Sequence, residues 1–237
     1  MKKIKIMKNA LLVLLVSISL MGYSQKRVLF DELTNTKFNG DEIMMYENEV
    51  FNGISFENYI EGTLKSEQTY KDGKSDGINK EWYKNGQIKF LKNFKNGNLN
   101  GISKDWYDNG QLSKEENYKV GRIYGLHKSW YANGQLSKKG NYIGSFSNDG
   151  LWEKWFKNGQ LEWSRNYKDG KGVGLHKSWH QNGQLWNEGN YKDGSRNGIQ
   201  KSWYESGKLE WERNYIDGRS ISKKCWDENG NKENCQW

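Results

Sequence analysis

The sequence has no proline, only two cysteines, and few aliphatic side chains for its 237 residues. Residues of the hydrophobic class make up 34%, many of them among the 12 tryptophans and 14 tyrosines, and the mean hydropathy is −1.05. Leucine, isoleucine and valine are therefore too sparse to fill one large core. A chain this polar is either disordered or a repeat array that buries a thin layer of large side chains, and an aromatic content of 14% favours the array.

Only one long hydrophobic run is present, from Ala10 to Met21, and it follows a lysine-rich start. Gly22-Tyr23-Ser24 then places small residues before a cut at Gln25, so residues 1–24 are predicted to be a signal peptide. The run is shorter than the ~20 residues that span a bilayer. We expect an exported chain (periplasmic, at the cell surface or secreted) that does not span the membrane after cleavage, with an uncleaved N-terminal anchor as the alternative. No cysteine stands at the cut, so a lipoprotein is excluded.

Removing this segment also removes half of the apparent positive charge. Without Lys2, Lys3, Lys5 and Lys8 the formal net charge falls from +8 to +4. Charges of both signs are interspersed in the rest of the chain, which is typical of a soluble surface. This balance does not indicate nucleic acid as a partner.

Glycines and tryptophans recur at a nearly constant spacing. Successive turn glycines are 24, 24, 25, 24, 24 and 23 residues apart, and a tryptophan stands four residues before each. Self-similarity at such a period indicates a repeat architecture. The predicted turn glycines are Gly86, Gly110, Gly134, Gly159, Gly183, Gly207 and Gly230. The tryptophans, which we expect to form a structural aromatic ladder, are Trp82, Trp106, Trp130, Trp155, Trp179, Trp203 and Trp226.

Each unit is predicted to be a β-hairpin. In one unit the strands are expected from Ile102 to Tyr107 and from Gln111 to about Tyr118, joined by an Asn-Gly turn, since Asn-Gly tolerates the positive φ of a tight hairpin. A second turn, such as Lys168-Asp169-Gly170, closes the unit. The fold class is therefore all-β, an elongated single-layer antiparallel meander or solenoid of roughly 14 to 16 strands. A one-residue insertion within 143–148 predicts a longer loop or bulge there.

The ends of the array differ from its middle. Residues 25–60 carry degenerate units and are predicted to be an N-terminal cap, residues 61–220 hold the tandem repeats, and residues 221–237 form a C-terminal capping hairpin. Cys225 and Cys235 flank that hairpin, and in an oxidising compartment we expect a disulfide, with two free thiols as the alternative. Exposed edge strands leave end-to-end association open.

These units resemble a known repeat family. The run from Trp106 to Leu112 (WYDNGQL), followed by Asn117-Tyr118, is similar to the core of the MORN repeat variant, over roughly residues 46 to 232. The resemblance implies tandem β-hairpins. Ordinary MORN repeats have a different Tyr-x-Gly-x-Trp core, so their membrane and phosphoinositide associations are not carried over. Bacterial members of the variant are often labelled antitoxins of toxin–antitoxin systems, although a signal peptide does not fit a cytoplasmic antitoxin.

The three histidines do not form an expected catalytic or metal site. His127 and His176 share one repeat slot, and His180 replaces a Tyr or Phe of other units. His176 and His180 are about 13 Å apart along a strand, too far to share a metal. The shared slot elsewhere holds Asn79, Ser103, Trp152 or Gln200. Because it accepts such different residues, we interpret it as an exposed strand position.

No enzyme activity, metal or cofactor is predicted. The sequence contains no Gly-x-Ser-x-Gly, phosphate loop or CxxC pair, and no two carboxylates stand out as acid and base. The Asp-Gly turns offer one carboxylate per unit, at Asp72, Asp169, Asp193 and Asp217. Calcium needs six to eight oxygen ligands, so turn chemistry explains these aspartates better than a calcium site.

Tryptophans outside the ladder offer a candidate binding surface. Trp163 and Trp211 follow the repeat leucine by two residues, and Trp152 and Trp186 enrich the same half of the array. In a single-layer sheet such rings can stack on sugars or contact a partner, and the alternative is that they only thicken the apolar layer.

The sequence thus predicts an exported, non-enzymatic repeat protein that binds another protein or acts as a cell-envelope scaffold. The first alternative is a carbohydrate- or cell-wall-binding module that uses exposed tryptophans. The second alternative is an antitoxin-like neutraliser of a partner toxin.

Overall fold

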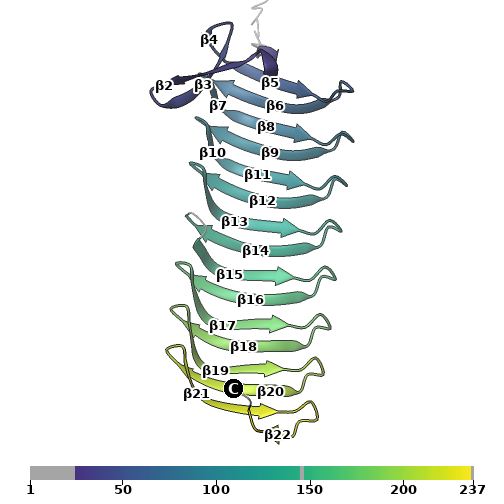
Figure 1. The fold of residues 1–237 in the computed structure, drawn as a ribbon, viewed down its shortest axis with the longest axis vertical. Helices are drawn as coiled ribbons and strands as arrows, with labels where there is room; N and C mark the ends of the chain where they lie inside the picture. The colour runs from purple at the N-terminus through teal and green to yellow at the C-terminus, as the bar shows by residue number, and fades with distance from the viewer. Residues whose placement is uncertain (1–24, 145–146, 236–237) are drawn as a thin grey trace, which may run out of the picture.

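The computed structural model describes residues 25–144 and 147–235, and these form one tall stack of β-hairpins (Figure 1). Nineteen of the described strands make the main sheet, and three make a small sheet near the N-terminal end. The predicted all-β, antiparallel repeat architecture is therefore confirmed. The predicted signal peptide, residues 1–24, lies outside the described residues.

Consecutive hairpins pair with one another along the stack. The first two are β5 (Gly53–Asn58) with β6 (Leu64–Lys71) and β8 (Gly77–Trp82) with β9 (Ile88–Lys95). The others are β11 (Gly101–Trp106) with β12 (Leu112–Lys119), β13 (Arg122–Trp130) with β14 (Leu136–Ile143), β15 (Ser147–Trp155) with β16 (Leu161–Lys168), β17 (Lys171–Trp179) with β18 (Leu185–Lys192), β19 (Ser195–Trp203) with β20 (Leu209–Ile216), and β21 (Arg219–Trp226) with β22 (Lys232–Glu233). Short strands β7 (Lys74–Ser75) and β10 (Asn98–Leu99) precede β8 and β11.

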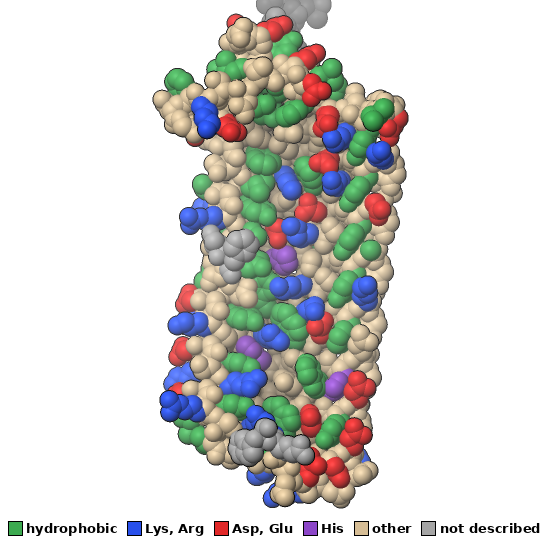
Figure 2. All heavy atoms as spheres, in the orientation of Figure 1, with side chains coloured by type: hydrophobic (Ala, Val, Ile, Leu, Met, Phe, Trp, Pro, Cys, Tyr) green, Lys and Arg blue, Asp and Glu red, His purple; other side chains and the backbone are tan. Residues whose placement is uncertain are grey.

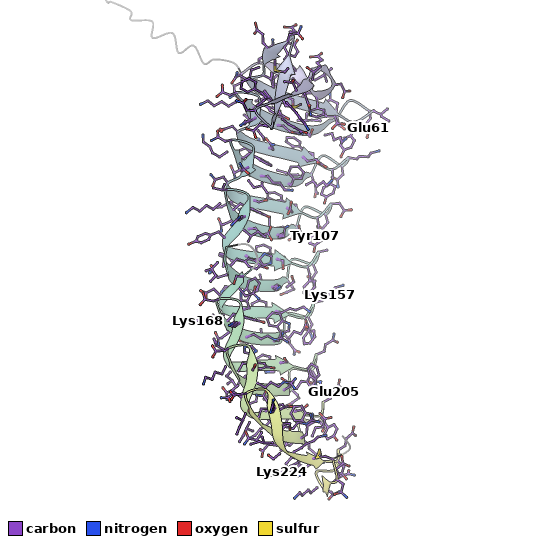
Figure 3. The ribbon with its side chains drawn as sticks, turned by 60° about the vertical axis from the view of Figure 1, so that its left-hand side comes forward. Glu61, Tyr107, Lys157, Lys168, Glu205 and Lys224 are labelled. Carbon is purple, nitrogen blue, oxygen red and sulfur yellow. A yellow bond between two sulfur atoms is a disulfide. The ribbon has the colours of Figure 1, made fainter. Side chains whose placement is uncertain are left out.

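Two kinds of turn form two rows at the margins of the sheet; Tyr107 and Glu205 mark one row in Figure 3 and Lys168 marks the other. In the Asn-Gly turn, the Gly110 N–H donates to the Tyr107 carbonyl (2.9 Å), and Gly110 has a φ of 84°. This geometry is that of a type I turn followed by a glycine bulge. Only the glycine needs the positive φ. The asparagine instead uses its side chain, because Asn109 Oδ1 accepts the Gln111 N–H (3.0 Å).

The Asp-Gly turn is the tighter of the two. Asp169 and Gly170 both have positive φ, 49° and 78°, and Lys168 pairs directly with Lys171. This is the two-residue type I′ connection that matches strand twist. Between Ile143 and Ser147 the connection is one residue longer, as the insertion predicted, although residues 145–146 lie outside the described part.

Hydrogen bonds join equivalent positions of successive repeats. At the Asn-Gly margin, Tyr107 Oη donates to the Trp130 carbonyl (2.8 Å). His180 Nε2 bonds the Trp203 carbonyl (3.0 Å) in the same way, which confirms that it replaces an aromatic residue. The same bond joins Tyr59 to Trp82, Tyr83 to Trp106, Tyr131 to Trp155 and Tyr204 to Trp226. At the other margin, turn-glycine N–H groups donate one repeat back, as Gly194 does to the Gly172 carbonyl (2.9 Å).

The slot shared by His127 and His176 is buried, so our interpretation of it as an exposed position is wrong. In four repeats the slot lies at a β-bulge, because its own strand has two more residues than the preceding strand between consecutive pairs. Three members bond a backbone carbonyl of the preceding strand, whereas His127 bonds the Glu116 side chain. His176 Nε2 bonds the Asn166 carbonyl (2.9 Å), Trp152 Nε1 the Asn141 carbonyl (3.0 Å) and Gln200 Nε2 the Asn190 carbonyl (2.8 Å). The buried members are Ser55, Asn79, Ser103, His127, Trp152, His176 and Gln200.

Both ends of the main sheet finish in short strands. At the N-terminal end β1 (Arg27–Leu29) pairs in parallel with β5, and η1 (Phe30–Glu32) leads into the small sheet of β2 (Thr34–Phe38), β3 (Asp41–Tyr46) and β4 (Glu49–Val50). At the C-terminal end the two-residue β22 is tied down by the Cys225–Cys235 disulfide, with 5.4 Å between the Cα atoms. Short end strands offer little backbone for pairing with another sheet.

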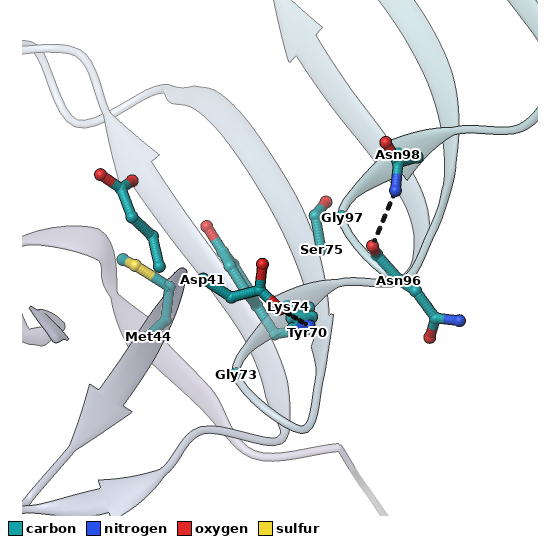
Figure 4. A pocket seen from close by; sticks show the side chains of 10 residues that line it. Asp41, Met44, Tyr70, Gly73, Lys74, Ser75, Asn96, Gly97 and Asn98 are labelled. Carbon is teal, nitrogen blue, oxygen red and sulfur yellow. Dashed lines mark hydrogen bonds and ion pairs between the residues drawn. The ribbon is translucent and has the colours of Figure 1, made fainter. Parts of the chain in front are cut away.

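A hollow of about 350 Å³ lies where the small sheet meets the row of Asp-Gly turns (Figure 4). Lys74 and Asp41 form an ion pair across it. Gly73 allows the close approach beside it, because a Cβ there would lie 2.3 Å from Ile43 Cγ2. The hollow is thus the junction at which the small sheet docks on the array.

Gly140→Ala tests how tightly the buried slot is matched to the opposite strand. A Cβ at Gly140 would lie 2.0 Å from the Trp152 ring, so we expect the free energy of unfolding to fall by about 1–3 kcal/mol. Trp152→Ser, which installs the residue found at position 103, removes the ring. In the Trp152→Ser background, Gly140→Ala should lower the free energy of unfolding by less than half as much as in the wild type. Urea unfolding of the four proteins measures the difference, and equal costs in both backgrounds would contradict the steric explanation.

Candidate functional site

The two faces of the sheet differ in what they expose. Side chains alternate along a strand, so His176, which is buried, and Leu175, which is exposed, point to opposite faces. We call the side of His176 the aromatic face, because the repeat tyrosines pack there, and the side of Leu175 the aliphatic face. Figure 2 shows the aromatic face, where histidines lie among hydrophobic side chains and charges of both signs.

Two adjoining hollows on the aromatic face form one groove, which we call the tryptophan groove. Their volumes are about 540 Å³ and 340 Å³, and Arg165, Ser178 and Trp186 line both. Trp186 is 49% exposed and stands between them. The first hollow is also lined by Phe156, Glu162, Trp163, Trp179, His180 and Gln181, and the second by Tyr167, Gly172, His176, Asn187, Tyr191, Gly194 and Arg196.

A β-bulge places Trp186 in this groove, whereas Trp163 pairs regularly with Lys154. Ser178 pairs with Asn187 and Trp179 with Leu185, which leaves Trp186 as the extra residue of β18. In a bulge, two consecutive residues oppose one partner, so both can reach the same face. The preceding hairpin has the same register shift, and both Glu162 and Trp163 line its hollow.

Arginines lie against the aromatic rings of the groove. The Arg165 guanidinium is 4.6 Å from the centre of the Trp163 ring, a cation–π arrangement. Arg196 donates to Tyr191 Oη (3.5 Å) and Tyr215 Oη (3.3 Å), and the bond to Tyr191 raises the pKa of Arg196. These side chains are therefore cationic and held in place at neutral pH.

His176 forms the floor of the second hollow. It stacks on Tyr191 with 4.2 Å between ring centres, and burial lowers its pKa despite the hydrogen bond to Asn166. A neutral imidazole at pH 7 follows, and because its partner is a carbonyl, Nε2 must carry the proton. The ring is thus a structural donor in the sheet.

The structure brings together only two of the four predicted binding tryptophans. Trp163 and Trp186 line the tryptophan groove. Trp211 lies farther along the array on β20, with the Arg213 guanidinium 5.4 Å from its ring centre. Trp152 is 0% exposed, so its prediction as part of a binding surface is wrong. Its ring fills the space above Gly140 and packs against Tyr142 at 4.7 Å.

The predicted turn glycines and ladder tryptophans lie at the Asn-Gly margin. All seven of these glycines have positive φ, between 83° and 91°. Six of the seven ladder tryptophans accept an inter-repeat hydrogen bond at their carbonyls: Trp82, Trp106, Trp130, Trp155, Trp203 and Trp226. Stacked ring pairs on the aromatic face instead involve the buried slot, such as His127 with Trp152 at 5.8 Å.

A buried ionic cluster in the N-terminal half escaped the sequence reasoning. Glu116 Oε1 is 3.1 Å from His127 Nδ1, and its Oε2 accepts from Tyr118 Oη (2.7 Å) and Lys114 Nζ (3.1 Å). Burial alone would raise the pKa of Glu116, but hydrogen bonds from His127, Tyr118 and Lys114 outweigh it and hold the pKa at about 2. The sequence signal for this cluster is that Glu116 pairs across the strands with His127 of the slot. Within residues 25–144 and 147–235, no three His, Cys, Asp or Glu side chains cluster as metal ligands.

The aliphatic face carries one exposed aliphatic side chain per repeat. Leu126 and Leu151 pair across strands with Asn141 and Asn166, so aliphatic and asparagine side chains alternate down this face. We call this row the aliphatic stripe. Its members, 37–50% exposed, are Ile78, Ile102, Leu126, Leu151, Leu175 and Ile199. The sequence signal is an aliphatic residue four positions before each of six ladder tryptophans, although strand alternation alone does not show which face is covered.

The family described as the MORN repeat variant matches six consecutive segments of the chain, together more than half of it. The matched residues are 75–96, 99–119, 123–143, 148–169, 173–193 and 196–217. A comparison with curated proteins finds no match. In the described part of the chain, no helix has the length and apolar character needed to cross a membrane.

Glu116→Gln tests whether the ionic cluster stabilises the sheet. Because the folded pKa is depressed to about 2 from a usual 4.5, the carboxylate stabilises the folded state above pH 4.5 and loses this effect as the pH falls toward 2. Allowing for solvent screening, we expect a loss of about 1–2 kcal/mol at pH 7. The difference from the wild type should shrink between pH 4.5 and pH 2 in urea unfolding. Glu115→Gln, on the neighbouring residue, is the control; a deficit independent of pH would refute the assignment.

Proposed function

Since the chain belongs to the MORN repeat variant family, we propose that it is an exported, non-enzymatic scaffold that binds a protein partner along the aliphatic stripe. Protein or membrane binding is common among MORN repeats. The observation that carries the proposal is the row of six aliphatic side chains left 37–50% exposed on one face. Exposed apolar side chains gathered in a row on one face mark a candidate interaction surface.

The regular stripe favours an elongated partner. Successive members are two strands apart, about 10 Å, so the six span about 50 Å. Covering the exposed remainder of each side chain contributes about 0.5–1 kcal/mol. No single residue dominates such a surface, and a stable complex requires contact with several repeats at once.

The histidines of the described sheet support a non-enzymatic role, because they are engaged internally. His127 bonds Glu116, His176 bonds the Asn166 carbonyl and His180 bonds the Trp203 carbonyl. A free imidazole for general acid–base chemistry is therefore not offered by these three side chains.

Export is supported by the disulfide between Cys225 and Cys235, a bond that persists in oxidising compartments. Mature protein from the periplasm or medium is expected to begin at Gln25 and to contain no free thiol. Intact-mass measurement before and after reduction and alkylation checks both points. A cytoplasmic protein that retains residues 1–24 and has two reactive thiols would be the contrary result.

Leu126→Lys with Leu151→Lys tests the stripe, because two adjacent charges interrupt its centre while the groove face is unchanged. We expect the proteins captured from envelope and medium by the wild type to fall at least tenfold on this variant. Trp186→Ala, on the opposite face, should retain them, and circular dichroism verifies that both variants fold. Equal capture by all three proteins would rule out the stripe. A small toxin among the proteins lost would identify the antitoxin-like form of this function.

A further inference from the structure

The tryptophan groove on the aromatic face is a second surface, independent of the stripe. Trp186 does not belong to the buried slot, whose seven members are covered, and its side chain is 49% exposed. The sheet itself therefore does not require a ring of this size there. Equivalent bulge positions in earlier hairpins hold Ser113 and Ser137. Trp186 therefore gives the groove an aromatic side chain that the fold of the repeat does not require.

The tryptophans follow the axis of the stack. Trp163 lies on β16, Trp186 on β18 and Trp211 on β20, and each step crosses two strands, about 10 Å. An extended β-1,4-linked glycan repeats its disaccharide at a similar length. Aromatic rings spaced in this way can stack on every second sugar ring of one chain, because sugar rings have apolar C–H faces and polar edges.

Polar side chains beside the rings fit the edges of sugars. Glu162, Gln181 and Asn187 line the groove and together offer donors and acceptors for hydroxyl groups. Glu162 adjoins Trp163, and Glu210 adjoins Trp211. The ion pair of Glu162 with Lys154 (2.8 Å) offsets its charge toward an acidic ligand, and the donors and acceptors for hydroxyl groups favour a glycan over a single-stranded nucleic acid.

The arginines of the groove favour a ligand that carries negative charge. Within the groove, Arg165 lies over Trp163 and Arg196 joins two tyrosines. Outside it, Arg213 lies over Trp211. The buried Nε of Arg213 has no hydrogen-bond partner within the described chain. Arginine stands at this position in two hairpins, both in the second half of the array, whereas the other hairpins hold Gln68, Lys92, Glu116, Gly140 and Gly189. A guanidinium pairs with carboxylates through two parallel bonds.

We propose that the tryptophan groove binds an extended, β-1,4-linked acidic glycan, with Trp163 and Trp186 stacking on its sugar rings and Arg165 and Arg196 pairing with its carboxylates. This binding does not depend on the protein-binding role of the aliphatic stripe. A scaffold with both activities would hold a protein partner on one face and a polysaccharide on the other.

Two hexasaccharides test the proposal with the mature, disulfide-bonded chain. Oligomers of β-1,4-mannuronate and β-1,4-mannose differ only in a carboxylate against a hydroxymethyl group, and isothermal titration measures both at low salt. We expect the mannuronate oligomer to bind at least tenfold more tightly than the mannose oligomer. Trp186→Ala and Trp163→Ala should each weaken mannuronate binding tenfold or more. Arg165→Gln with Arg196→Gln should remove the preference while leaving the weaker binding to mannose oligomers.

Matched controls distinguish this site from general effects. Phe90 in the N-terminal half occupies the repeat position of Trp163, and Phe90→Ala should leave the affinity for the mannuronate oligomer unchanged. The Leu126→Lys, Leu151→Lys variant of the aliphatic stripe should leave it unchanged as well. Because Trp186 is half exposed, its removal should leave the melting temperature nearly unchanged. No heat with either oligomer up to several millimolar, tryptophan variants that bind normally, or tighter binding of a single-stranded oligonucleotide would each overturn the proposal.

Discussion

Hydrogen bonds between equivalent positions of successive repeats are the constraint on which this sheet depends. A single layer has no second sheet to cover it, so each hairpin must be fixed by its neighbours. At one margin a tyrosine or histidine donates to the next ladder-tryptophan carbonyl, and at the other a turn glycine donates to the preceding repeat. These bonds tie most successive repeats at both margins, which explains why the period varies by only one residue from 24. Where Phe156 stands in the donor position, its ring carries no group that can make this bond.

The bulge beside each buried slot imposes a second requirement. It leaves a backbone carbonyl away from its ladder partner, and an unpaired buried carbonyl is costly. Trp152, His176 and Gln200 differ in shape and hydropathy, yet each supplies an N–H to the equivalent carbonyl. The opposite position adjusts to the size of the donor: Gly140 accommodates the indole, and a Cβ at Gly189 would overlap Gln200. For these three members, variation in the slot therefore reflects a shared chemical need rather than freedom at an exposed surface.

These two requirements explain how far the sequence could predict the structure. Periodic glycines and tryptophans specified the hairpins, their order and the two rows of turns, because each depends on local backbone conformation. The periodic residues did not predict on which face of the sheet Trp152 is buried. Its burial depends on a bulge and on Gly140 of the preceding strand, neither of which shows in a two-residue alternation. Trp186 reaches the groove for a related reason, since a bulge brings consecutive residues to one face.

Residues that carry function in such a lattice are those that its hydrogen bonds and packing do not require. Ladder tryptophans, turn glycines and slot donors recur because each repeat needs them, so their prominence in the sequence says little about ligands. Trp186 occupies a position that serine fills in two earlier hairpins, and Arg165 and Arg213 occupy one that glutamine, lysine, glutamate or glycine fills in others. The stripe differs again, because it is periodic and yet left uncovered by the fold. The two proposed binding surfaces rest on these two kinds of feature: one that repeats without being buried, and one that interrupts the repeat without being needed by the fold.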